Sequence, residues 1–142
     1  MKINQTYLYL ASCLAIVLAL SCGDDDGIEE PNSELVGTWV ASSASLSGCS
    51  DPSENGEELL PCTTQLCTKI EFTNDGSFIT RETVNGVESM ETGTYTISGN
   101  LVVITVDGTP DQADFTVNGN TLTLSLLEED TGCTLRFIWT RE

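Results

Sequence analysis

The stretch that decides the fold is Asn118-Gly119-Asn120-Thr121-Leu122-Thr123-Leu124-Ser125-Leu126-Leu127. Its Asn-Gly pair supplies residues that adopt positive φ, which a tight hairpin needs. Strict alternation follows, so that in an extended chain Leu122, Leu124 and Leu126 share one face and hydroxyl side chains share the other. The stretch therefore predicts a half-buried β-strand that leaves a hairpin turn.

The same pattern, short alternating runs between turns of Gly, Asn and Asp, continues through the chain from residue 34. It predicts eight strands, over residues 35–44, 67–73, 77–84, 88–97, 101–106, 113–117, 121–127 and 133–140. Nearly all are joined by loops of hairpin length, and only the first two are separated by a long polar segment. Such a meander leaves two unpaired edges unless it closes, and eight strands suffice to close a small barrel. The predicted fold class is all-β, an eight-stranded up-and-down antiparallel barrel.

Alternation also indicates which side chains face the barrel interior. On the second strand Ile70 and Phe72 oppose Lys69 and Glu71. The first and last strands each place one set of mainly apolar residues on a single face, Leu35, Gly37, Trp39 and Ala41 on the first and Cys133, Leu135, Phe137, Trp139 and Arg141 on the last. The inner faces so defined carry Leu, Ile, Phe, Val and Thr, with no pair of carboxylates marked as inward-facing. They suit packing or an apolar ligand rather than acid–base catalysis.

Composition excludes several classes of function. The chain has 142 residues, with 5 Lys+Arg against 22 Asp+Glu and a formal charge of −17, and nucleic acid and anionic membrane surfaces repel such a chain. The absence of His removes Ser-His-Asp and Cys-His catalysis and every zinc site that uses His. There is no Gly-rich phosphate loop, and the run Asp24-Asp25-Asp26-Gly27 lacks the alternating ligands of a calcium loop. We expect no enzymatic activity, no cofactor, no metal and no nucleic-acid partner.

The N-terminal residues predict export. Lys2 precedes an apolar run of 14 residues, Tyr7 to Leu20, which is shorter than the about 20 residues of a membrane-spanning helix and indicates a signal peptide over residues 1–21. The junction Leu18-Ala19-Leu20-Ser21-Cys22 resembles the lipobox of bacterial lipoproteins, in which the cysteine becomes the acylated N-terminus, although that family favours Leu where Ala19 stands. The same junction also suits an ordinary signal peptidase, which would leave a soluble secreted protein.

The residues after the junction predict where the protein is displayed. Gly23-Asp24-Asp25-Asp26 resembles the acidic export tag that surface lipoproteins of Bacteroidetes carry directly after the lipidated cysteine. Residues 22–33 are acidic, contain Gly and Pro, and form a flexible linker to a barrel domain at residues 34–142. We expect an outer-membrane lipoprotein, exposed at the cell surface or facing the periplasm, whose only membrane contact is the lipid on Cys22.

The remaining cysteines predict disulfides at one end of the barrel. Cys13 leaves with the signal peptide and Cys22 is acylated, so an even number remains, as exported proteins prefer: Cys49, Cys62, Cys67 and Cys133. Their positions relative to the expected strands place all four at one rim. Four cysteines allow three pairings, of which strand adjacency favours Cys49–Cys133 with Cys62–Cys67. The alternative, a Cys₄ zinc site, lacks a Cys-x-x-Cys pair.

Three sequence features resemble the lipocalin pattern: Gly37-Thr38-Trp39 on the first strand, Arg141 at the end of the last, and Gly93-Thr94-Tyr95-Thr96-Ile97 ahead of a Gly-Asn turn. The resemblance is to the small lipocalin-like domains of Bacteroidetes lipoproteins and covers Leu35 to Glu142. In a closed meander the first and last strands are antiparallel neighbours, which brings Arg141 beside Trp39. The guanidinium can then stack on the indole and close one end of the barrel as a structural plug.

Two classes of function follow. The lipocalin resemblance implies binding of a small hydrophobic ligand, with candidate wall residues Ile70, Phe72, Phe78, Tyr95, Phe115, Leu122, Leu124 and Phe137. The same residues can simply fill the barrel, since eight strands leave an interior that side chains occupy. The alternative is a cell-surface interaction or accessory module without a ligand, which meets a protein or a glycan through its outer face or its disulfide-bound rim loop. An exposed apolar patch around Val102, Ile104 and Val106 would support that alternative.

Overall fold

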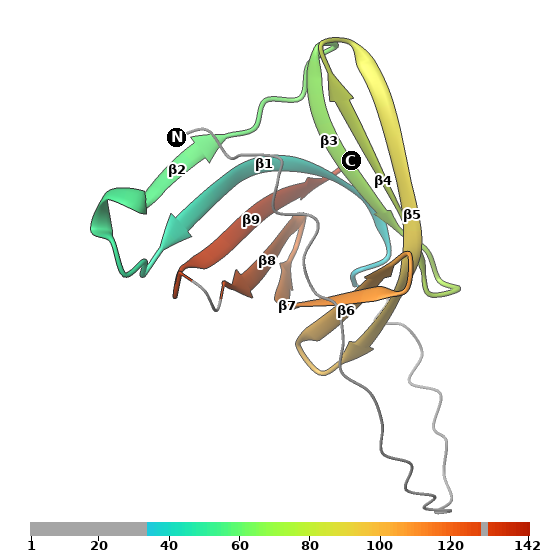
Figure 1. Cartoon of the computed structure of the whole chain (residues 1–142). Coiled ribbons are helices and arrows are strands. Elements are labelled where there is room, and N and C mark those ends of the chain that lie inside the picture. The colour runs from blue at the N-terminus through green and yellow to red at the C-terminus, as the bar shows by residue number, and fades with distance from the viewer. Residues whose placement is uncertain (1–33, 129–130) are drawn as a thin grey trace, which may run out of the picture.

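The computed structural model describes residues 34–128 and 131–142 (Figure 1). The expected signal peptide, the linker and the lipidated Cys22 lie outside the described residues. Within the described part of the chain, no helix has the length and apolar character to cross a membrane.

The described chain is almost entirely antiparallel β-sheet (Figure 1). The strands are numbered in chain order, and one short 3₁₀ helix, η2 (Pro52–Glu54), lies between the first two strands. The strands are β1 (Gly37–Ser47), β2 (Gly56–Leu59), β3 (Leu66–Phe72), β4 (Ser77–Val84), β5 (Val87–Ser98), β6 (Leu101–Val106), β7 (Thr109–Asn118), β8 (Thr121–Leu127) and β9 (Thr134–Arg141).

Pairing between the first and last strands closes the sheet into a barrel. From β3 to β9 each strand pairs with the next, β3 pairs with β1, and β1 pairs with β9 from Trp39↔Arg141 to Ser47↔Thr134. Eight strands therefore form a closed antiparallel barrel, which confirms the predicted fold class. β7 begins four residues earlier than expected, at Thr109.

A ninth strand, β2, was not predicted. It pairs with β1 at Ser43–Leu46, on the same edge of β1 that pairs with β3 at Gly37–Val40. Because both strands share one edge, residues 66–68 of β3 have only β4 as a strand neighbour. The barrel wall is thus complete at one end, which we call the closed end. At the other end, which we call the open end, the wall divides between β2 and β3 (Figure 1).

A β-bulge in β1 preserves the inward face across this division. The register to β9 shifts between Ala41 and Ser43, which leaves one extra residue in β1. Beyond the shift Ala44 and Leu46 lie opposite Phe137 and Leu135, so even-numbered residues of β1 now share the inner face. Without the bulge, every later side chain of β1 would change face.

The core fills the closed half of the barrel. Its buried members lie on the inner faces of the strands, apart from Leu35, which precedes β1. The largest fully buried side chains of the core include those of Trp39, Phe72, Phe78 and Leu122. The partly buried hydrophobics packed against this core are Leu60, Ile97, Ile104, Val106, Val117, Leu126 and Phe137.

The exposed apolar patch that would have supported an interaction module is not formed by Val102, Ile104 and Val106. Val102 is fully buried, and Ile104 and Val106 pack against the core. Cross-strand pairing explains this, because Ile104 lies opposite Tyr95 and Val102 opposite Ala113, which are both buried inside. The outer side of β6 carries Leu101 and Val103, which are half-buried.

Candidate functional site

The closed end is held by one arginine. The Arg141 guanidinium lies 4.1 Å from the centre of the Trp39 ring, within cation–π distance. Its Nη1 donates to the carbonyl of Val36 (2.9 Å) and its Nη2 to the carbonyl of Glu34 (2.6 Å). The Trp39 Nε1–H donates to the carbonyl of Leu35 (2.8 Å). Arg141 therefore ties the last strand to the residues that lead into the first and has a structural role.

Two glycines of the lipocalin-like phrases are explained by close approach. Gly37 has φ +137°, and a Cβ there would lie 2.6 Å from Arg141 Nη1. A Cβ at Gly93 would lie 2.2 Å from the Thr105 carbonyl oxygen and 2.5 Å from Phe78 Cε1. Side chains at these positions would displace the Arg141 guanidinium and the Phe78 ring. The glycines of the two lipocalin-like phrases are therefore explained by close packing inside the barrel.

The proposed wall residues lie together, mostly within the core. Seven of the eight are at most 5 % exposed and belong to one buried cluster: Ile70, Phe72, Phe78, Tyr95, Phe115, Leu122 and Leu124. Phe137 is only partly buried and packs against that cluster. These side chains fill the closed half, which leaves the open half as the place where a ligand could enter.

Tyr95 anchors the packed aromatic group. Its ring meets Phe72 edge to face at 5.0 Å, and its hydroxyl donates to the carbonyl of Thr73 (2.7 Å). Burial raises the pKa of the Tyr95 phenol, and the negative charge of Asp75 raises it further. The hydrogen bond thus caps the β3–β4 turn from inside the barrel.

The inner face continues beyond the core as exposed apolar surface. Leu66, Val84 and Val87 are paired in one row across β3, β4 and β5, and their exposed fractions are 42 %, 39 % and 71 %. They have the same strand parity as the buried Ile70 and Phe78. We call this row the rim row. The sequence did not reveal this row because Leu66 and Val87 each stood one residue outside the expected strands.

Carboxylates also lie on the inner face of the open half, contrary to the expectation from sequence. Cross-strand pairing places Glu58 opposite Ala44, Glu82 opposite Thr68, Glu91 opposite Thr80 and Asp111 opposite Ile104, all on inward-facing parity. Glu82 is half-buried and the other three are exposed. Their strands extend past the packed core, where acidic residues meet solvent even on the inner side. We call these four residues the mouth acids.

One buried polar atom inside the barrel is unpartnered. Trp139 is 7 % exposed, lies opposite Ala41 and Leu122, and its Nε1–H has no hydrogen-bond acceptor among the described residues. A buried donor left unpaired costs about 1–3 kcal/mol. An acceptor brought in by a ligand or by water would recover that energy.

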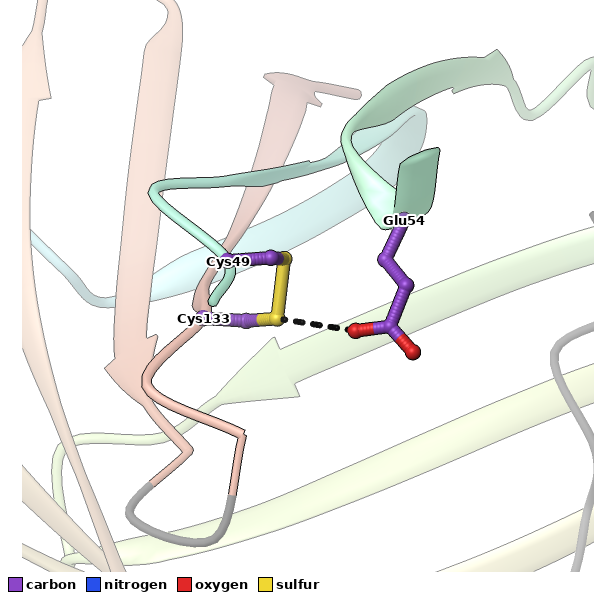
Figure 2. A group of neighbouring side chains, drawn as sticks. All are labelled: Cys49, Glu54 and Cys133. Carbon is purple, nitrogen blue, oxygen red and sulfur yellow. Dashed lines mark hydrogen bonds between the residues drawn. A yellow bond between two sulfur atoms is a disulfide. The ribbon is translucent and has the colours of Figure 1, made fainter. Parts of the chain in front are cut away.

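Both disulfides lie at the open end, as predicted from the positions of the four cysteines relative to the strands. Cys49 is bonded to Cys133, with a sequence separation of 84, and Cys62 is bonded to Cys67. Figure 2 shows Glu54 beside the first pair, with Oε2 3.9 Å from Cys133 Sγ. These atoms are close enough for a metal site, but each sulfur is bonded to the other and offers no thiolate. The group is therefore a disulfide that joins the loop after β1, which we call the rim loop, to the residue before β9.

An open depression of about 460 Å³ lies beside β2 and is lined by Ser53, Asn55, Gly56, Glu57 and the mouth acid Glu58, with no member of the rim row. Its lining is polar and acidic. It is thus distinct from the rim row.

Comparison with known proteins agrees with this architecture. No curated protein matches the chain. The family model described as a lipocalin-like domain matches residues 35–131, more than half of the chain. This family fold is typically one that binds ligands rather than catalyses reactions. With its closed eight-stranded barrel and its match over most of that barrel, the chain belongs to the lipocalin-like domain family.

Proposed function

We propose that the protein binds a small hydrophobic ligand at the open half of its barrel, while a lipid on Cys22 holds it at the outer membrane. The observation that carries the ligand proposal is the rim row. Three apolar side chains on an inner barrel face remain exposed at the mouth, where apolar surface is costly to leave in water. A hydrophobic ligand would cover them.

The packed closed half sets the depth of the site. The floor consists of residues that pack against the core, such as Phe137, Leu126 and Ile104. The ligand would therefore contact these residues and the rim row, rather than reach Phe72 or Leu122 at the closed end. This supports a short or shallowly bound ligand.

The test compares two pairs of exposed apolar residues. Val84→Thr with Val87→Thr makes the rim row polar at similar volume. Met90→Gln with Leu127→Gln removes apolar surface on the outer face, where these residues are 63 % and 69 % exposed. We expect the neutral dye Nile red to bind the wild type and to bind the rim pair at least about tenfold more weakly. The outer pair should bind like the wild type. Equal loss in both pairs, or no binding to the wild type, would overturn the proposal.

Anchoring is supported by the junction Leu18-Ala19-Leu20-Ser21-Cys22 and the acidic residues after it. Cys22→Ala should move the protein from the membrane fraction to the soluble fraction, because an acylated cysteine gives stable attachment. Cys13→Ala is the matched control and should stay with membranes. Membrane association that is unchanged in Cys22→Ala would sink the lipid anchor.

Display at the cell surface is tested separately. Added protease should degrade the wild-type protein on intact cells while a periplasmic marker survives. Protection until the outer membrane is broken would instead place the domain in the periplasm.

A further inference from the structure

We propose that the barrel mouth selects ligands by charge, and that its ligand has an apolar body with a positively charged head group. This inference deepens the proposed ligand binding and rests on it. It follows from where the structure places the charged side chains of the described residues.

Cations are absent from the inner face of the open half in the described part of the chain. Lys69 pairs with Glu142, and Arg81 pairs with Glu71 at 3.3 Å, on the outer face. Arg136 is exposed on the outer side of β9, opposite Ser45 and Ser125. The remaining described cation, Arg141, is inward but sits at the closed end.

The four mouth acids occupy that same inner face. They come from β2, β4, β5 and β7, so the mouth carries negative charge on several sides of its circumference. The rim row of Leu66, Val84 and Val87 lies between β3 and β5, among the strands that carry Glu82 and Glu91. Apolar walls with an acidic border suit an amphiphile whose head is cationic and disfavour a carboxylate head.

An anion could instead bind with its carboxylate inward, on the Nε1–H of Trp139, and the structure disfavours this orientation too. A buried carboxylate needs a cation or several donors to offset its desolvation. Arg141 is committed to the carbonyls of Glu34 and Val36 and to the Trp39 ring. Among the described residues, the closed half therefore offers a carboxylate head group no uncommitted cation.

The experiment compares three probes with ten-carbon chains: decyltrimethylammonium, 1-decanol and decanoate. Each is titrated by calorimetry into the mature chain, residues 22–142, with Cys22→Ala, which carries neither an acyl chain nor the apolar run Tyr7–Leu20. We expect the cation to bind at least about tenfold more tightly than decanoate, with the alcohol between them. Tighter binding of decanoate would overturn the charge selection and leave the proposed ligand binding intact. Failure of all three probes to bind would remove both proposals.

A matched pair of variants separates the mouth from the overall charge. The inner variant carries Glu58→Gln, Glu91→Gln and Asp111→Asn. The outer variant carries Glu57→Gln, Glu88→Gln and Asp114→Asn, which removes the same charges from the opposite faces of the same three strands. The inner variant should lose most of the preference for the cation, and the outer variant should keep it. Equal loss in both would show a general field and overturn the proposal.

Discussion

Gly37 controls how closely the last strand approaches the first. Its φ of +137° strains any other residue, and a Cβ would collide with the Arg141 guanidinium. Gly37→Ala should therefore lower the free energy of unfolding by about 2–3 kcal/mol, which urea unfolding would measure.

Gly99→Ala provides the control for backbone strain alone. Gly99 has φ +59° in the β5–β6 turn, and a Cβ at this position would meet no atom within 4 Å. Its substitution should cost about 1 kcal/mol. Equal losses for Gly37→Ala and Gly99→Ala would show that contact with Arg141 contributes nothing.

Tyr95 links stability to alkaline pH. Its pKa is raised in the folded state, so the stability it contributes is complete below the unfolded value of about 10 and is lost as pH rises through the higher folded value. Tyr95→Phe should lower the free energy of unfolding by about 1 kcal/mol at neutral pH, because the hydrogen bond to Thr73 is removed. The difference between the two proteins should shrink above pH 10 in chemical unfolding. A constant difference from pH 7 to 11 would contradict this account.

Among the elements, the two disulfides differ in how much chain they constrain. Cys49–Cys133 closes a loop with a separation of 84 residues, and Cys62–Cys67 one of only 5. Chain entropy predicts losses of about 4–5 and about 2 kcal/mol when each pair is replaced by two serines. The two double variants are matched controls for each other in thermal unfolding. A larger loss of stability on removing Cys62–Cys67 would mean that contacts in the folded protein, rather than the entropy of the unfolded chain, determine how much each disulfide stabilises.

The elements also show what the sequence could predict. Strands with strict alternation, such as the one around Leu122 and Leu124, were found with their inner faces. β2 was missed because Gly56–Leu59 carries two adjacent acids and is held to β1 by backbone pairing. The start of β7 was missed because Thr109–Gln112 is polar and contains Pro110, which lacks the N–H of a regular strand residue.

The sequence could predict which side chains of the candidate site face inward, but not how deeply each one is buried. Ile70 and Leu66 have the same parity on β3, yet one is 5 % and the other 42 % exposed. Parity comes from the strand period, whereas depth depends on where β1 leaves β3 for β2. That exchange of partners is a property of the closed sheet, so no single run of residues encodes it. Among the mouth acids, Glu58 and Asp111 stood outside the expected strands. Glu82 and Glu91 stood within them, on the same parity as Phe78 and Tyr95.

At the scale of the whole molecule, net charge sets the response to salt. With 22 acids against 5 bases, like charges repel more strongly in the folded state than in the expanded chain. Raising NaCl from about 0.01 to 0.15 M shortens the Debye length from about 30 to 8 Å and should raise Tm by about 2–5 °C. Differential scanning calorimetry would measure this, with equimolar sucrose as the uncharged control. A Tm that falls with salt would mean that attractive ion pairs dominate.

The hydrogen bond from Arg141 to the carbonyl of Glu34 has a consequence for orientation. The chain enters the barrel at its closed end, and β1 then runs 11 residues, about 35 Å, toward the mouth. The 12 linker residues, 22–33, can span at most about 40 Å, and in the proposed anchored protein they would connect the lipid on Cys22 to the closed end. Under the proposed lipid anchor, the barrel would join the bilayer through its closed end, so a ligand would reach the mouth from the surrounding medium rather than by lateral exchange with the lipid.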